Sequence, residues 1–220
     1  NDTPSVLVDG PSRPQLLTEM AQDFQADIIL LGPNQAAPKG RFFPGSTADT
    51  LLHYSPLSLG LIPRKAKLSK HGVTRFNFVI TERGERADRK LLGAAALADR
   101  WDLPLRILAF SADDLLHSPS KDKSDIALKL TAEWHEDSLA MLDRARDHIQ
   151  DAYPEIEVTS EIGSGAGWSG AVDSLKWKKG DLMLMASAPQ GPIARVFLGS
   201  TATELLPHIR VPVLIHPATD

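Results

Sequence analysis

Short apolar runs alternate with longer amphipathic stretches along most of the chain. Apolar runs without polar alternation are typical of strands in a parallel sheet that is covered on both faces. The predicted strands are residues 6–8, 28–31, 57–62, 76–80, 105–110, 156–162, 182–185 and 211–215. The predicted helices are residues 14–25, 87–100, 131–152 and 171–177, and two more follow the Gly-Ser-Thr sequences at 45–47 and 199–201. This alternation implies an α/β fold with a parallel sheet, helices on both faces and right-handed crossovers.

Two of the helix predictions include details that the structure can test. The helix over residues 131–152 has an apolar side that we expect to be buried, and its members are Trp134, Leu139, Leu142, Ala145 and Ile149. The glycine-rich stretch 163–170 is expected to be a turn that leads into the helix 171–177.

The segment 27–63 is repeated, without a gap, as the segment 181–217. The offset is constant at 154 residues, the separation of Asp27 from Asp181. The residues shared at this offset are Asp27/Asp181, Arg41/Arg195, Phe43/Phe197, Gly-Ser-Thr-Ala at 45–48 and 199–202, Leu51-Leu52/Leu205-Leu206 and Pro63/Pro217. An offset of one domain length indicates a tandem repeat of one fold. We therefore assign residues 1–66 to the C-terminal half of a first domain, 67–72 to a linker and 73–220 to a complete second domain.

Each copy ends in an apolar strand that would be an exposed sheet edge if it were left alone. The first runs from Leu57 to Ile62 and the second from Val211 to Ile215. We expect these two strands to pair about a pseudo-two-fold axis, either within the chain or in a homodimer. We also expect the first copy to be incomplete in this sequence, because the strand at 28–31 requires a neighbour on each side.

Between strand and helix, each copy carries a loop that ends in Gly-Ser-Thr. In the second copy the loop reads Ala186-Ser-Ala-Pro189, nine residues, then Gly199-Ser200; in the first it reads Gly32-Pro-Asn-Gln35, nine residues, then Gly45-Ser46. This arrangement resembles the G-x-x-G, nine residues, G-[ST] loop of the universal stress protein family. Both copies depart from the family pattern, since Ala186 and Pro189 replace the two glycines in the second copy and Gln35 replaces one in the first.

The resemblance implies an adenine nucleotide alpha-hydrolase-like fold, with a doubly wound parallel five-stranded sheet in the order 3-2-1-4-5. Nucleotide-binding members of the family hold ATP phosphates with this loop and direct an aspartate after the first strand at the base or sugar. Thr81 or Glu82 stands at that aspartate's position here. If ATP or AMP binds, the resemblance places it in the second copy, with Thr81 near the base. The residues expected near the phosphates are Gly191, Arg195, Gly199, Ser200 and Thr201.

The loop residues can also be interpreted without a ligand. Gly-Ser-Thr can be only a helix start, with Thr201 as N-cap and Glu204 at the spacing of a capping box. Arg41 and Arg195 can meet a phosphate, or they can be exposed arginines that improve solubility. The sequence leaves both pairs of alternatives open.

Composition narrows the classes of function. The 220 residues are 42% hydrophobic and 24% charged, which is ordinary for a soluble globular protein. A net charge of −4 argues against broad binding to nucleic acid or acidic membranes. The lack of cysteine excludes disulfides and thiolate chemistry and agrees with a reducing cytoplasm, where we expect the protein. We see neither metal-ligand spacing nor a nucleophile motif such as G-x-S-x-G, so we expect no metal and no catalytic residues.

Three functions remain to be compared. The first is a universal stress protein-like module that acts in the stress response through protein contacts, with a degenerate ATP-binding loop. The alternative is an ATP- or AMP-sensing protein that uses the cleft of the second copy. An enzyme of the wider nucleotide-handling group comes third, because no acid or base set accompanies the loop.

Overall fold

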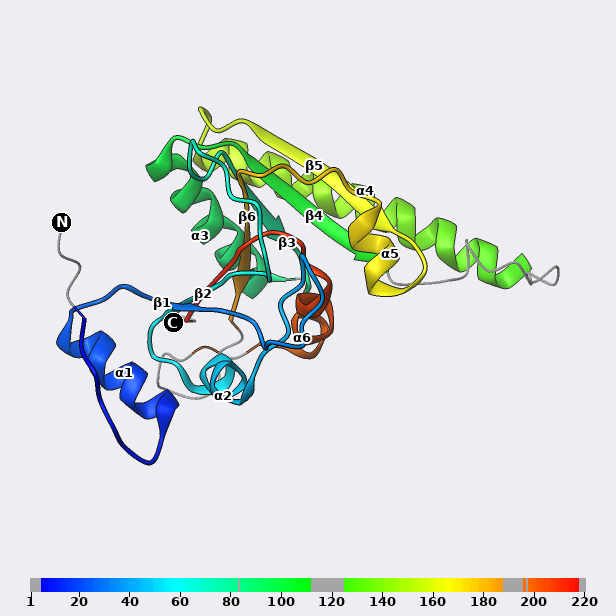
Figure 1. Cartoon of the computed structure of the whole chain (residues 1–220). Coiled ribbons are helices and arrows are strands. Elements are labelled where there is room, and N and C mark those ends of the chain that lie inside the picture. Colours follow the sequence, from blue (N-terminus) through cyan, green and yellow to red (C-terminus); the bar gives the residue numbers. More distant parts are fainter. Residues whose placement is uncertain (1–4, 83, 112–124, 188–195, 197, 218–220) are drawn as a thin grey trace.

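The computed structural model describes residues 5–82, 84–111, 125–187, 196 and 198–217. Seven strands form one sheet in the order β1-β2-β7-β6-β3-β4-β5 (Figure 1). The strands are β1 (Ile28–Leu31), β2 (Ser58–Leu61), β3 (Arg75–Val79), β4 (Leu105–Ser111), β5 (Val158–Ser164), β6 (Asp181–Ala186) and β7 (Val213–His216). All neighbouring strands are parallel except β2 and β7. The fold is therefore α/β with a mostly parallel sheet, as predicted.

The second copy accounts for five of these strands. Counted along the chain from β3, they lie in space as 3-2-1-4-5, since β5, β4, β3, β6 and β7 are successive neighbours. The short apolar strands of the first copy, β1 and β2, extend the same sheet beyond β7.

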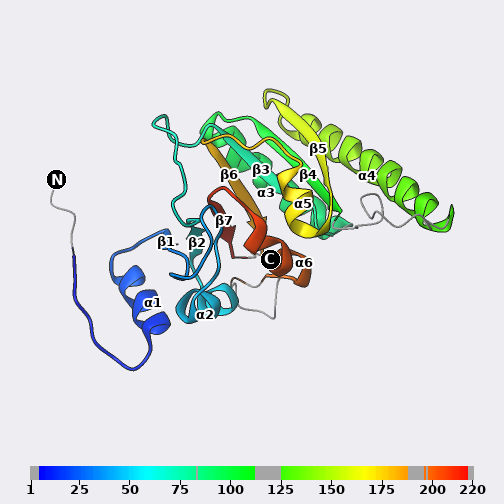
Figure 2. The ribbon, with the colours of Figure 1, turned by 45° about the vertical axis from the view of Figure 1, so that its right-hand side comes forward.

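Helices cover the two faces of the sheet (Figure 2). They are α1 (Arg13–Asp23), α2 (Ser46–Tyr54), α3 (Glu85–Trp101), α4 (Asp125–Ala152), α5 (Gly167–Asp173) and α6 (Ser200–Leu205), which continues as the 3-10 turn η2 (Leu206–His208). On one face, α3 and α4 pack on Phe76, Phe78 and Ile107. On the other face, α2, α5, α6 and η2 share a larger core with both copies of the repeat.

The two copies meet through β2 and β7. These strands pair antiparallel, with Leu59 opposite Ile215 and Leu61 opposite Val213, and all four side chains are buried. The backbone N–H of Val196 also donates to the carbonyl of Ser55 at 2.8 Å, which joins the second copy's loop to the first copy. The predicted pairing of these two terminal strands is confirmed, and it occurs within one chain.

Some boundaries differ from the sequence predictions. Residues 6–8 are not a strand, and Leu7 is 98% exposed, because no described strand lies beside them to accept their hydrogen bonds. The long helix α4 begins at Asp125, six residues earlier than predicted. Leu139 is 47% exposed rather than buried, and Ser138 faces the core in its place. The buried positions 138, 142, 145 and 149 keep the helical spacing and Trp134 is half-buried, so Leu139 alone was assigned to the wrong side of the helix.

The glycine-rich turn was also placed wrongly. Strand β5 continues through Ser164, and α5 covers Gly167–Asp173 instead of 171–177. Close packing explains the shift, because a Cβ on Gly163 would stand 2.6 Å from the carbonyl oxygen of Ala171. The glycine lets α5 start almost directly on the end of β5, and Trp177 falls in the loop that follows.

Candidate functional site

The predicted ligand site lies where the strand order reverses, beside the carboxyl ends of β3 and β6. Thr81 lies two residues beyond β3 and is exposed. Gly199, Ser200 and Thr201 form the start of α6; Ser200 is exposed and the other two are half-buried. No hydrogen bond joins Thr81 to these three residues in the described part of the chain. Gly191 and Arg195 lie outside the described residues.

The start of α6 does not follow the predicted capping box. Gly199 is the N-cap residue in extended conformation, and no side chain caps this end of the helix. Thr201 lies inside the first turn, and Glu204 accepts a hydrogen bond from Trp168 Nε1 at 3.1 Å instead of turning back to the cap. The first copy repeats this arrangement, with Gly45 as N-cap of α2 and no side-chain bond. Thr201 as N-cap is therefore wrong, because glycine takes that position and the serine becomes the first helical residue.

The carboxylate that follows β3 is paired with a lysine of α3. Glu82 forms an ion pair with Lys90 of α3, whose side chain is only 17% exposed. Glu82 and Ile80, which follow β3, line a cavity of about 360 Å³ between α3 and α4, together with Leu91, Met141, Arg144 and His148. Of the two candidates for the family's aspartate position, Glu82 is thus occupied elsewhere and Thr81 remains.

Arg41, in the loop of the first copy, is not exposed. Its side chain is 12% exposed, and it reaches from the first copy to α5 and η2 of the second. Nη2 donates to Ser169 Oγ at 2.9 Å and lies 3.3 Å from Asp173 Oδ2, and Nη1 donates to the carbonyl of His208. The interpretation of Arg41 as an exposed arginine is therefore wrong, because its side chain is 12% exposed and its partners come from the other copy of the repeat, whereas contact with a phosphate stays a prediction.

Asp173 is the centre of this contact. It receives hydrogen bonds from Arg210 as well as Arg41, and the Arg210 bond is the main reason why the pKa of Asp173 is lowered. Burial lowers the pKa of His208, and the adjacent charge of Arg41 lowers it further. The cluster of Arg41, Asp173, His208 and Arg210 ties the two copies together through charge. We call it the Asp173 cluster.

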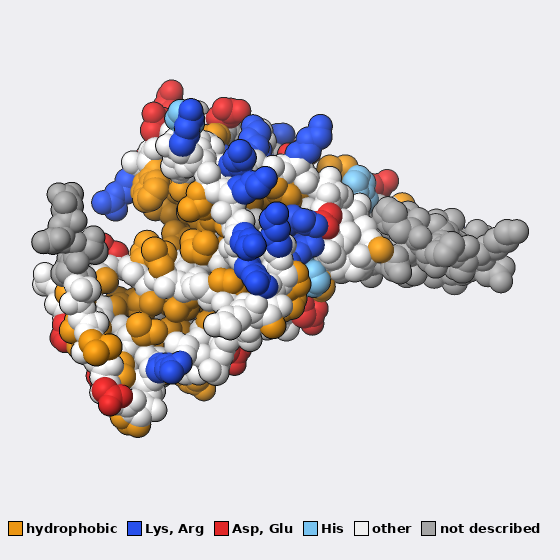
Figure 3. Space-filling view, in the orientation of Figure 1, with side chains coloured by type: hydrophobic (Ala, Val, Ile, Leu, Met, Phe, Trp, Pro, Cys, Tyr) orange, Lys and Arg blue, Asp and Glu red, His pale blue; other side chains and the backbone are white. Residues whose placement is uncertain are grey.

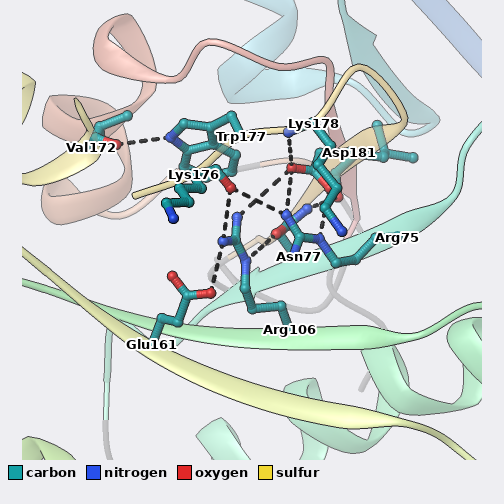
Figure 4. A network of polar contacts seen from close by, with 10 residues as sticks. Arg75, Asn77, Arg106, Glu161, Val172, Lys176, Trp177, Lys178 and Asp181 are labelled. Atoms are coloured by element: carbon teal, nitrogen blue, oxygen red, sulfur yellow. Dashed lines mark hydrogen bonds and ion pairs between the residues drawn. The ribbon is translucent and has the colours of Figure 1, made fainter. Parts of the chain in front are cut away.

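Figure 4 shows a second polar network. It lies near the amino-terminal ends of β3 and β6, whereas the predicted ligand site lies beside their carboxyl ends. Arg106 of β4 is fully buried and donates from Nε to Asn77 Oδ1 at 2.7 Å and from Nη1 to Glu161 Oε1 at 3.2 Å. Its guanidinium also lies over the ring of Trp177, 4.9 Å from the centroid. Burial is the largest cause of a lowered pKa of Arg106, followed by the charge of Arg75.

Asp181 balances the two arginines of this network. Its carboxylate accepts two bonds from Arg75, each 2.8 Å long, and one from the backbone N–H of Lys178 at 2.7 Å. Arg106 Nη2 lies 3.8 Å from the same carboxylate and has no hydrogen-bond partner among the described residues. Because Arg75 and Asp181 begin β3 and β6, the network lies far along the strands from the switch point and anchors α5 and its loop to the sheet.

Two searches of the described residues bear on other kinds of site. No group of three or more His, Asp or Glu side chains is placed to hold a metal ion in the described part of the chain. None of the helices in that part is both long enough and apolar enough to cross a membrane.

Comparisons with known proteins agree with this architecture. The model of the universal stress protein family matches residues 78–217. Universal stress proteins of Mycobacterium tuberculosis and Mycobacterium bovis are 27% identical over 201 residues, which is 91% of this chain and 68% of each relative. A universal stress protein structure from Archaeoglobus fulgidus has a TM-score of 0.53 at 19% identity, over 92% of this chain and 66% of that one. A putative universal stress protein from Pseudomonas aeruginosa has a TM-score of 0.54 at 13% identity, over 94% of this chain and 69% of its own. At these identities the two structures show the fold alone, and this chain spans about two thirds of their length.

Proposed function

Because this chain belongs to the universal stress protein family, we propose that it is a stress-response module that acts through protein contacts and has a degenerate ATP-binding loop. Family membership supports the role in the stress response. The observation that carries the protein-contact mechanism is the degenerate loop, in which Ala186 and Pro189 replace the two glycines of the family pattern. Figure 3 shows hydrophobic side chains gathered in a hollow over the region where Figure 1 places β1 and β2.

Two features support weak nucleotide binding. Ala186 and Pro189 stand where the family loop has glycines, so a Cβ is added at one position and an N–H is removed at the other. In addition, Glu82 is paired with Lys90 on the side of α3, so the carboxylate next to the family's aspartate position is not directed at a nucleotide base. Both features would weaken contacts that nucleotide-binding members make.

The alternative function is an ATP or AMP sensor, and one observation favours it. No side chain caps α6, so the loop's final Gly199-Ser200-Thr201 leaves its hydroxyl groups uncommitted to the helix end. In this alternative the phosphates lie near Gly191, Arg195, Gly199, Ser200 and Thr201, and the base lies near Thr81.

Calorimetric titration with ATP and Mg²⁺ separates the two functions. We expect weak or undetectable binding by the wild type, and stronger binding by the double variant Ala186→Gly with Pro189→Gly, by about 1–3 kcal/mol or roughly 5- to 150-fold. Gln35→Gly is the matched control, because it restores a loop glycine in the first copy, outside the cleft of the second copy. Tight ATP binding by the wild type would favour the sensor, and no binding by either protein would remove the nucleotide from the function.

A further inference from the structure

Lysines gather on two neighbouring loops at the amino-terminal ends of β3 and β6. The loop between α5 and β6 carries Lys176, Lys178 and Lys179, and the linker that leads into β3 carries Lys70. The backbone N–H of Thr74 donates to the carbonyl of Gly180 at 2.8 Å, so the chain after the linker lies directly beside the first loop. All four lysines are exposed, and Figure 3 shows Lys and Arg side chains gathered over the region where Figure 1 labels β3 and β6. We call these four residues the lysine patch.

The backbone beneath the lysine patch is held in place by the network of Figure 4. The carbonyl of Lys176 accepts hydrogen bonds from Arg75 Nη2 at 3.3 Å and from Arg106 Nη1 at 3.2 Å. The backbone N–H of Lys178 donates to Asp181 Oδ2 at 2.7 Å. A loop that is fixed in this way loses little conformational freedom when a ligand binds, so its side chains present a preorganised surface.

The positive charge of the lysine patch is not neutralised within the described part of the chain. Among the described residues, no carboxylate forms an ion pair with any of the four lysines. The adjacent carboxylates are already bound, since Asp181 pairs with Arg75 and Glu161 pairs with Arg106. The segment 64–72 adds further basic residues and no acidic one. The patch is therefore positive, although the chain as a whole has a net charge of −4.

The repeat shows that the fold does not require lysines at this place. In the first copy, the connection between α1 and β1 corresponds to the lysine-bearing connection between α5 and β6. The residues at the positions equivalent to 176, 178 and 179 are Gln22, Phe24 and Gln25. The same connection is thus made without basic residues, so the charge of the second copy's loop is not explained by folding.

The lysine patch is also separate from the edge of the sheet at β1. The repeat assigns the place beside β1 to the first copy's own upstream strand, whereas β2 and β7 lie between β1 and β6. Three strand spacings of about 4.8 Å put β6 about 14 Å from β1. The patch, at β6 and β3, therefore lies away from the place where that upstream strand would pack.

We propose that the lysine patch binds a short acidic segment, rich in Asp and Glu, of a partner protein. A single exposed ion pair contributes little, but several ammonium groups on one fixed surface act together on the same segment. Complementary charge of this kind also speeds the encounter and selects against basic partners. The proposal rests on the protein-contact function and specifies the chemistry of the partner.

Two observations favour an acidic polypeptide over a nucleic acid or a membrane. At the same edge of the sheet, the exposed Asp102, Glu155 and Glu157 precede β4 and β5, the next strands beyond β3. A duplex or a membrane surface is wider than the patch and would bring its phosphates against these carboxylates, whereas a short peptide can lie within the patch. Trp177 packs against the core and under the guanidinium of Arg106, so it is not free to stack on a base as single-strand binding requires.

The test uses the 220-residue chain and a fluorescein-labelled decapeptide of alternating Asp and Glu. Fluorescence anisotropy at about 50 mM salt should show saturable binding that weakens as the salt concentration rises, because exposed charges are screened. The double variant Lys178→Glu with Lys179→Glu should weaken binding roughly tenfold or more, since attraction is replaced by repulsion. A decapeptide of alternating Asn and Gln should not bind.

The control variant is Lys129→Glu with Arg144→Glu, which makes the same change in net charge at exposed positions of α4 and should leave peptide binding unchanged. Absence of binding, or equal weakening by the two double variants, would overturn the proposal. So would tighter binding of a labelled decathymidylate than of the peptide, since the patch would then serve a nucleic acid. These outcomes are independent of the ATP titration: tight ATP binding overturns the proposed function, whereas failure of the peptide removes only this partner.

Discussion

Asp27 and Asp181 show how one residue type serves two environments at equivalent places in a repeat. Asp181 is buried between Arg75 and Arg106, so its loss would leave the fully buried Arg106 and the half-buried Arg75 without their shared counter-charge. Removing one partner from a buried pair costs about 3–5 kcal/mol. We predict that Asp181→Asn lowers the free energy of unfolding by about 3 kcal/mol, measured by urea denaturation.

The matched control for that prediction is Asp27→Asn. Asp27 is exposed and bonds to no described residue, so its substitution should change stability by about 0.5 kcal/mol at most. Equal effects of the two substitutions would mean that the Asp181 network adds no stability.

Asp173 gives a prediction for acid conditions. The pKa of this carboxyl group is lowered in the folded protein, chiefly by the hydrogen bond from Arg210. A lowered folded-state pKa contributes stability above the ordinary range of aspartate, near pH 4, and this contribution is lost as pH falls through the folded value. We predict that the wild type loses more stability between pH 5 and pH 3 than Asp173→Asn does, by about 1 kcal/mol or less because the side chain is 35% exposed.

The measurement is the urea midpoint at several pH values. Asp143→Asn is the control, since Asp143 makes a single local pair with Arg146 and is 59% exposed. A steeper acid loss for Asp173→Asn than for the wild type would contradict the assignment of the cluster.

At the residue scale, the sequence identified positions better than it identified partners. Arg41 was recognisable because it recurs as Arg195, but its contacts with Asp173 and His208 join residues more than a hundred positions apart. Spacing and periodicity carry no information on such contacts. Nothing in the sequence indicated that Arg106 is buried. An arginine within an apolar run is expected at an exposed position or on an edge strand until the packing around it is known.

At the scale of elements, glycine packing sets where α5 begins. A Cβ at Gly163 would meet the backbone oxygen of Ala171 at 2.6 Å, which the helix can relieve only by moving. We predict that Gly163→Ala destabilises the protein by about 1–3 kcal/mol, measured by urea denaturation. Gly93 of α3 is the matched control, because it is exposed and nothing lies within 4 Å of its Cβ position. Gly93→Ala should stabilise by about 0.5–1 kcal/mol, since alanine is the better helix former. Stabilisation by both substitutions would contradict the prediction, because it would show that α5 moves to accommodate the added Cβ at no cost in stability.

The kinds of element were largely predictable, and their ends were not. Apolar runs identified the seven strands, since a strand buried on both faces needs no tertiary information to be recognised. The end of β5 and the start of α5 were misplaced because they depend on the approach of Gly163 and Gly165 to α5, which is a tertiary contact. Residues 6–8 were wrongly assigned to a strand because they are apolar, although no described strand lies beside them.

At the scale of the whole molecule, the repeat predicted that β2 and β7 would pair, and the structure adds that they share one core. Leu51, Leu59, Leu205 and Ile215 belong to a single buried cluster, although the first two come from the first copy and the others from the second. A repeat in sequence does not by itself show whether copies fold as separate units or as one. The continuity of the sheet and of this core indicates one cooperative unit.

We therefore predict a single unfolding transition, and the tryptophans make the prediction testable. All four, Trp101, Trp134, Trp168 and Trp177, lie in the second copy, so their fluorescence reports that copy while far-ultraviolet circular dichroism reports both. Leu59→Ala removes a fully buried side chain of the first copy at the β2–β7 junction and should cost about 2–4 kcal/mol. If the copies form one unit, the fluorescence and dichroism midpoints in urea move together by the same amount. Leu7→Ala, at a residue that is 98% exposed, should move neither. A fluorescence midpoint that stays in place while the dichroism curve splits would mean that the first copy unfolds independently, despite the shared sheet.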